Sequence, residues 1–390
     1  MSEVWTEARS DARSRASRRV RFRGGPALGI VLPGLPQLLA GRLAAGGYVT
    51  ALWVGLVTLL MYRWERVWAA PTGALDEQIA FATLALGIAG ALAWSIRDLR
   101  KGRDPLPMSR SQWGLASRAF RKNRVAVLAV GMVAFFYLVA LLTPFIAPFD
   151  PTFQGDLLAD RLSGPSATHL LGTDHFARDI FSRLLYGARI SLSIGFVAVS
   201  ISITIGTLLG AVSGYLGGAV DSVIMRGVDM VISFPRLVLL ITIIALFEPS
   251  ITLIVVILGL TQWPQVTRIV RGEVLSLRER EFVQAGAALG FSRVRIVLRH
   301  VIPNILAPVI VAASLGIGDT IVLEAGLSFL GLGVQPPTPS WGTMVADGRN
   351  NLLGAWWIST FPGLAIVFVV LSFNLAGDGL RDALDPRLRS

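Results

Sequence analysis

The residue types best suited to chemistry lie in one polar stretch, residues 149–186. Asp174, His175 and Ser182 supply the groups of a hydrolytic triad there. A triad is defined by geometry, and closeness along the chain does not establish one. His169 and His175 are too few for a metal site, which needs three or four ligands. We therefore expect neither catalysis nor a metal ion in this stretch.

The charges of the same stretch favour a structural role. Acidic and basic residues follow one another closely at Asp174, Arg178, Asp179 and Arg183. Asp174 and Arg178 are four residues apart, a spacing at which side chains meet on a helix. We expect a short helical segment there, in which hydrogen bonds and ion pairs fix the loop.

The sequence carries no nucleotide-binding motif of its own. Its only lysines are Lys101 and Lys122, and neither lies in G-x-x-x-x-G-K-[ST], so the chain has no P-loop. We expect this chain to hold no cofactor and to be no enzyme, so any ATP and Mg²⁺ that its activity required would have to bind to another subunit. The absence of cysteine excludes disulfides and thiolate sites.

Composition indicates an all-α polytopic membrane protein. Hydrophobic residues make up 53% of the 390 residues and charged residues only 16%, and several apolar runs exceed the roughly 18 residues that a membrane helix needs. The formal net charge of +11 comes from arginines that are sorted by loop, which indicates topology and not nucleic-acid binding. The polar, arginine-rich N-terminus predicts no cleaved signal peptide.

Eight segments are long enough to span a membrane. They are residues 44–62, 78–96, 125–146, 190–215, 220–247, 251–270, 305–332 and 356–375. Residues 97–124 hold nine Lys/Arg, whereas residues 149–186 hold three. By the positive-inside rule, both termini are cytoplasmic and residues 149–186 lie outside, in the cell membrane. The apolar stretch 26–40 is broken by prolines and is predicted to be interfacial.

A polar, arginine-rich island at residues 271–304 separates two of these spans. Ser276 and Glu279 have capping-box spacing, which predicts a helix from about Leu277. Gly290 would end that helix in a left-handed conformation, and Ser292 would cap a second one. The expected helix faces are Phe282, Ala285, Gly286 and Leu289 in the first helix, and Val294, Val297, Leu298 and Val301 in the second.

The island resembles the EAA loop of ABC-importer membrane subunits. The resemblance rests on the spacing of Ala285, Gly290 and Pro303, and the chain departs from the pattern at Gln284, Gly286 and His300. It implies that the loop docks on an ATP-binding subunit. The residues expected to take part are Phe282, Gln284, Ala285, Gly286, Leu289, Gly290, Arg293 and Pro303. An amphipathic helix lying on the membrane is the alternative.

Two further runs resemble the peptide/nickel branch of these permeases. One is an outer-loop signature that contains Gly172, Thr173, Asp174, Arg178, Asp179 and Arg183. The other runs from Glu324 to Gly333 and continues at 335–342. Ala177 stands where the branch usually has glycine. The resemblance covers roughly residues 110–390 and implies the six-helix core of a type I importer permease. It also implies a second homologous permease, two ABC ATPases and an extracytoplasmic substrate-binding protein as partners.

The domain organisation follows from where the resemblance begins. Residues 1–25 form a cytoplasmic arginine-rich tail, 26–100 an extra membrane hairpin peripheral to transport, 101–124 a linker, and 125–390 the permease domain. Asp319 and Glu324 lie within a span, where ionisable groups face protein or water. They would line a translocation pathway or contact a partner helix. They are also the only candidates for the ion site of a gradient-driven secondary transporter, the competing interpretation.

Overall fold

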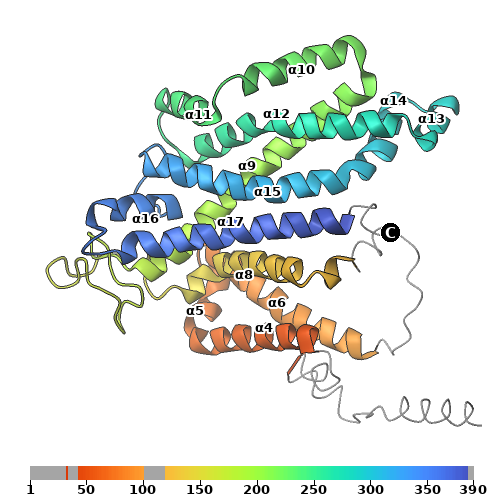
Figure 1. Ribbon diagram of the computed structural model, residues 1–390. Helices are drawn as coiled ribbons and strands as arrows, with labels where there is room; N and C mark the ends of the chain where they lie inside the picture. The colour runs from red at the N-terminus through yellow and green to blue at the C-terminus, as the bar shows by residue number, and fades with distance from the viewer. Residues whose placement is uncertain (1–31, 34–42, 101–118, 385–390) are drawn as a thin grey trace, which may run out of the picture. The chain divides into compact units, whose positions relative to one another are not determined.

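The computed structural model describes residues 32–33, 43–100 and 119–384, and within these it contains helices and no β-strand (Figure 1). The arginine-rich tail 1–25, the interfacial segment but for two residues, and residues 101–118 of the linker lie outside the described residues. Contacts divide the chain into two compact units, residues 1–106 and 107–390. Each unit is described by itself.

Unit 1 is a helical hairpin. It consists of α4 (Leu43–Tyr62), α5 (Trp64–Ala69), the 3₁₀ turn η1 (Ala70–Thr72) and α6 (Leu75–Arg100). Leu56 of α4 is buried against Gly87 of α6, where a Cβ atom would lie 2.9 Å from its side chain. The two helices therefore approach closely at a residue with no side chain.

Unit 2 contains most of the described helices. They are α8 (Arg124–Ile146), α9 (Ile180–Leu216), α10 (Gly218–Ile232), α11 (Arg236–Ala245), α12 (Ile251–Arg278), α13 (Glu281–Ala288), α14 (Arg293–Ile296), the π-helical η2 (Val297–Val301), α15 (Ile302–Phe329), α16 (Trp341–Gly348), η3 (Arg349–Asn351) and α17 (Trp357–Leu384). The long helices lie side by side, with the 147–179 loop and α16 at one end and α13 and α14 at the other (Figure 1).

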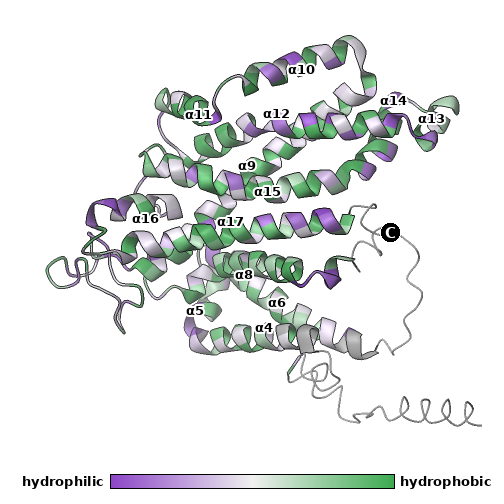
Figure 2. Cartoon of the chain, viewed as in Figure 1, coloured by the Kyte–Doolittle hydropathy of each residue, from purple (hydrophilic) through white to green (hydrophobic). Residues whose placement is uncertain are grey.

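Within the described residues, six helical stretches are long and apolar enough to cross a membrane: 75–95, 124–146, 180–216, 251–278, 293–329 and 357–384. Hydrophobic residues cover much of their length (Figure 2). The pair α10 and α11 passes the same test only together, with a 79° bend at its break, and the apolar part of α4 is shorter. The expected eight spans thus correspond to these six, the bent pair and α4.

Several helix ends differ from the predicted spans, and one predicted span is broken; two of these differences have clear local causes. Helix α9 begins at Ile180, ten residues before the expected start, because the Asp179 carboxylate accepts a hydrogen bond from the Ser182 backbone N–H and caps it. The span predicted at 220–247 is two helices, because Pro235 lies at the break and cannot donate a backbone hydrogen bond.

Helices α9 and α12 are packed with little space between them. Three glycines of α9, four residues apart, lie against three valines of α12: Gly206 on Val266, Gly210 on Val270 and Gly214 on Val274. A Cβ atom at Gly210 would lie 2.7 Å from the Thr267 carbonyl oxygen and from Val270 Cβ. Small residues at this spacing let membrane helices approach closely.

Gly210→Leu should therefore destabilise unit 2. The added side chain has no room, and overpacking costs about 1–3 kcal/mol or more. Gly131→Leu in α8 is the matched control, because a Cβ atom there meets nothing within 4 Å. Thermal unfolding of both purified variants in detergent tests this. Equal melting temperatures would show that the glycine contacts are not tight.

Candidate functional site

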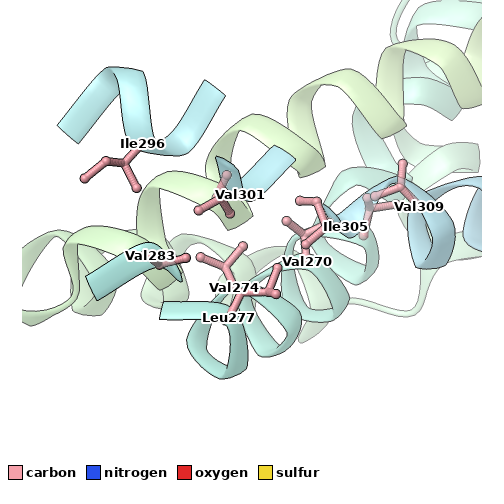
Figure 3. Close-up of a cluster of buried hydrophobic side chains, with 10 residues drawn as sticks. Val270, Val274, Leu277, Val283, Ile296, Val301, Ile305 and Val309 are labelled. Atoms are coloured by element: carbon pink, nitrogen blue, oxygen red, sulfur yellow. The ribbon is translucent and has the colours of Figure 1, made fainter. Parts of the chain in front are cut away.

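The 271–304 loop is built on a buried hydrophobic cluster (Figure 3). Its labelled members come from α12, α13, α14, η2 and α15: Val270, Val274, Leu277, Val283, Ile296, Val301, Ile305 and Val309. The cluster holds the short helices α13 and α14 against the ends of two long helices. Any displacement of α13 therefore acts directly on α12 and α15.

The turn between α13 and α14 confirms the prediction for Gly290. Gly290 has a φ of +78°, and its N–H donates to the Ala287 carbonyl at 3.0 Å. The Phe291 N–H donates to the Gly286 carbonyl at 3.1 Å, which completes a Schellman motif. Ser292 caps α14, also as predicted, by accepting a hydrogen bond from the Arg295 N–H.

The predicted helix start near Leu277 is wrong. Helix α12 continues to Arg278, and α13 begins only at Glu281. Val274 and Leu277 extend the buried stripe that begins at Val270, so continuing the helix buries two apolar side chains. Ser276 therefore lies inside α12, where its capping-box spacing has no effect.

The outward face of α13 also differs from the prediction. Gly286 is buried, and its position faces Phe291 at 3.5 Å, within the loop itself. Phe282, Ala285 and Leu289 are exposed, Leu289 to 73%. We call these three residues the α13 face. It is apolar and has no covering among the described residues.

Of the other loop residues, some are exposed and some are buried. Gln284 is exposed and its amide donates to the Glu279 carbonyl, Arg293 is the exposed first residue of α14, and Pro303 lies in the first turn of α15. In the second helix, Val301 is buried, whereas Val294 and Leu298 are exposed. The apolar face predicted for this helix is therefore not buried as a unit, because Ile296, which was not part of it, packs into the hydrophobic cluster.

At the opposite end of unit 2, Asp174 organises a tight turn. Its carboxylate accepts hydrogen bonds from the backbone N–H groups of Phe176 and Arg178 at 2.8 and 3.0 Å. The helical segment expected here is wrong: the side chain takes the place of helical backbone acceptors. Ala177 adopts a φ of +57° in this turn, a conformation that glycine adopts more easily.

The Asp174 turn forms a buried ion-pair cluster. Arg178 Nε donates to Asp174 at 2.7 Å, and Arg183 Nε lies 3.6 Å from the same carboxylate oxygen. Asp347 of α16 pairs with Arg183 at 3.2 Å and with Arg178 at 3.5 Å. Burial raises the pKa of the Asp347 carboxyl, and the two guanidiniums oppose that rise. Sequence reasoning missed Asp347, which lies far away in the chain.

The remaining residues of the outer-loop signature also hold the loop in place. Gly172 has a φ of +80°, and a Cβ atom there would lie 2.8 Å from Trp357 Nε1. The indole N–H of Trp357 donates to the Thr173 carbonyl at 3.1 Å. Asp179 caps α9 and contacts His169 Nδ1 at 2.9 Å. These residues fix the loop on α9 and α17.

The residues of the hypothetical triad do not converge. The Ser182 hydroxyl accepts from the Phe149 N–H, Asp174 is engaged by Arg178, and His175 Nδ1 is buried without a hydrogen-bond partner. Within the described ranges, no group of three or more His, Asp or Glu side chains is arranged to hold a metal ion.

Glu324 is the centre of a second polar cluster and is fully buried. It accepts hydrogen bonds from the hydroxyls of Ser328 at 2.7 Å, Ser340 at 3.0 Å and Ser191 at 3.3 Å. Ser191 also accepts from the Trp341 N–H at 3.2 Å. Glu324 thus joins α9, α15 and the start of α16, and in this conformation it faces no surface. Glu324 was expected either to line a translocation pathway or to contact a partner helix, and this geometry favours the packing contact.

Asp319 differs from Glu324 because it is exposed on α15. Neither a hydrogen bond nor an ion pair reaches its carboxylate from the described part of the chain. The guanidinium of Arg236, at the break between α10 and α11, attracts it electrostatically. Asp319 is therefore available for an interaction that this chain alone does not make.

Comparison with known proteins identifies two matching families. Residues 206–390 match the family described as "Binding-protein-dependent transport system inner membrane component", and residues 111–165 match the "N-terminal TM domain of oligopeptide transport permease C". The dipeptide transport system permease protein DppC of Alkalihalophilus pseudofirmus is 43% identical over 72% of this chain and 91% of its own length. The oligopeptide transport system permease protein OppC of Haemophilus influenzae is 41% identical over 72% of this chain and 90% of its own length.

Loss of the Glu324 carboxylate should loosen the contact between α15 and α16. Glu324→Ala leaves a cavity and deprives three buried hydroxyls of their acceptor, at a cost of about 3 kcal/mol or more. Glu324→Gln keeps one acceptor oxygen and should cost less. Glu248→Ala removes an exposed carboxylate and serves as the control. Thermal unfolding of the purified protein should rank the variants in this order, and an unchanged melting temperature in Glu324→Ala would contradict the assigned role.

Proposed function

Because this chain belongs to the peptide/nickel family of ABC-importer membrane permeases, we propose that it forms half of the translocation pathway of an ATP-driven peptide importer. A second, homologous permease would supply the other half. The names of the relatives, which include dipeptide and oligopeptide permeases, support a di- or oligopeptide as substrate. Nickel, which other members of this branch carry, is the alternative substrate.

The observation that carries the proposal is the α13 face. It places exposed apolar side chains on a loop otherwise rich in arginine, and surfaces of this kind on short helices are suited to docking in a groove of a partner protein. We propose that each of two ABC ATPases engages such a face, on this permease or on the second one. The ATPases supply the ATP and Mg²⁺ chemistry.

Transmission would follow from the cluster beneath the α13 face. When ATP binding draws the ATPases together, α13 moves with the surface on which it is docked. Val283 and Ile296 share their buried cluster with residues of α12 and α15, so these helices must move or the cluster must open. A packed element with two discrete arrangements is what such coupling requires.

At the other end, the 147–179 loop would receive a substrate-binding protein outside the cell. The Asp174 cluster makes this loop rigid, and Leu158 and Leu353, at this end of unit 2, are almost fully exposed. A rigid loop loses little conformational entropy on docking. We place both termini in the cytoplasm and residues 1–100 at the periphery of the pathway.

The competing function is a secondary transporter driven by an ion gradient, with Asp319 as the exposed ionisable group. Proteoliposomes that contain both permeases, the ATPases and the binding protein separate the two functions. Uptake of dialanine that needs ATP and persists when ion gradients are collapsed supports the importer. Uptake driven by an ion gradient without ATP would replace it with the secondary transporter.

Changes on and beside the α13 face should separate the permease from its ATPases. Leu289→Glu places a charge in the proposed contact, and Gly290→Val forces a β-branched residue into the left-handed region, at a cost of about 1–2 kcal/mol. Gly286→Trp should push Phe291 outward and deform the same face. Each variant should insert in the membrane but lose co-purifying ATPase or ATP-driven uptake by at least about tenfold.

Leu158→Glu is the matched control, because Leu158 is equally apolar and even more exposed. It belongs to the 147–179 loop, which lies at the opposite end of unit 2 from α13 (Figure 1). Leu158→Glu should leave ATPase binding unchanged. Normal ATPase binding and normal uptake in all three loop variants would mean that α13 is not the coupling element.

A further inference from the structure

Asp319 occupies an unusual place in α15. It lies ten residues from the helix end nearest to α16, and Val322 and Gly326 follow it on the same side of the helix. All three are exposed, and a Cβ atom at Gly326 would meet nothing within 4 Å. This half of α15 therefore presents an uncovered apolar face that contains one carboxylate.

The guanidinium of Arg236 attracts the Asp319 carboxylate electrostatically. Arg236 is the first residue of α11, directly after the break at Pro235. One of its terminal nitrogens reaches the Leu258 carbonyl at 3.5 Å, a long contact, and its Nε is buried without a hydrogen-bond partner. A guanidinium carries five N–H donors, so most of its bonding capacity is unused.

Helix α12 contacts the surroundings of both charges, at positions one helical turn apart. Arg236 contacts Leu258 of α12, and one turn further along Gln262 accepts a hydrogen bond from the Thr320 hydroxyl at 3.1 Å. Thr320 follows Asp319 directly in α15. The carboxylate and the guanidinium attract each other across this junction, yet they form no ion pair.

Two opposite charges left apart inside apolar spans are costly unless they face water or a charged ligand. The free ends of a short peptide are an ammonium and a carboxylate, separated in a dipeptide by about 7 Å at full extension. Such a molecule could satisfy both side chains at once. The guanidinium would hold the peptide carboxylate through paired N–H donors, and the Asp319 carboxylate would hold the ammonium.

We propose that Asp319 and Arg236 form a subsite in the translocation pathway for the two charged ends of a short peptide. The inference rests on the proposed function and deepens it. A subsite on a transport route must bind weakly enough to release its ligand. Two single charges on different helices meet that condition, because a movement of α11 relative to α15 changes the distance between them and releases the peptide.

The first test is ATP-driven uptake of dialanine by the reconstituted complex. Asp319→Asn should reduce uptake per ATP hydrolysed at least tenfold, and Asp319→Glu should retain most of it. Asp378→Asn, which removes an exposed carboxylate from α17, should leave uptake unchanged. ATPase co-purification and basal hydrolysis should remain normal in all variants. Wild-type uptake in Asp319→Asn would overturn the subsite alone, whereas absence of uptake by the wild-type complex would overturn the proposed function and the subsite with it.

The double variant Asp319→Asn/Arg236→Gln distinguishes a subsite from a structural charge pair. If the two charges only balance each other, removing both should restore uptake lost in either single variant. If they bind the ends of the peptide, the double variant should be at least as impaired as the poorer single variant. Restored uptake would therefore contradict the proposal.

A chemical measurement tests whether Asp319 faces water. The chain contains no cysteine, so Asp319→Cys creates one thiol in this subunit. With a cysteine-free second permease, a membrane-impermeant cationic thiol reagent should label it in the assembled complex, and saturating dialanine should slow the labelling. Val367→Cys on the exposed side of α17 should remain unlabelled. No labelling of Asp319→Cys in either the ATP-bound or the ATP-free complex would overturn the proposal.

Discussion

The close approach of α9 to α12 is the contact on which unit 2 depends. In a bilayer, the hydrophobic effect does not drive helices together, so van der Waals contact and the absence of obstructing side chains must do so. Gly206, Gly210 and Gly214 have no side chains, so α12 can lie directly against α9. Helix α9 also contacts α8, α10, α15, α16 and α17. Its position relative to α12 therefore determines where the other helices can lie.

The two ends of this helical frame are stabilised by different interactions. At one end, buried side chains around Val274 and Val301 hold the short helices by apolar contact. At the other end, the clusters around Asp174 and Glu324 hold α16 and the 147–179 loop by directional hydrogen bonds and ion pairs. Apolar contacts permit small sliding movements, whereas a buried polar network favours one geometry. The end proposed to receive motion is thus the more adaptable one.

Local sequence signals predicted local structure well. The conformation of Gly290 and the cap at Ser292 need only a few neighbouring residues, and both are confirmed. The signal at Ser276 failed because a stronger one, the buried periodicity from Val270 to Leu277, continues through it. Tertiary packing outweighed a local capping preference worth about 1 kcal/mol.

Contacts between residues far apart in the chain could not be predicted from the sequence. The spacing of Asp174 and Arg178 correctly predicted that they meet, but not that a turn, instead of a helix, brings them together. The pairing of Arg183 with Asp347 joins residues 164 positions apart. The acceptor role of Glu324 likewise depends on a serine from α9 and another from the start of α16. No periodicity in one chain segment encodes such partners.

The length of α9 has a mechanical consequence. Its 37 residues extend for about 55 Å at 1.5 Å per residue, well beyond the roughly 30 Å of a bilayer's hydrocarbon core. Arg183 of the ion-pair cluster lies in its first turn, and Gly214, packed on Val274, lies near its last. The helix is therefore long enough to extend beyond the hydrocarbon core on both sides of the membrane. Tilting it by about 5° about one end would displace the other by about 5 Å, so a small rotation at the membrane surface becomes a large movement on the far side.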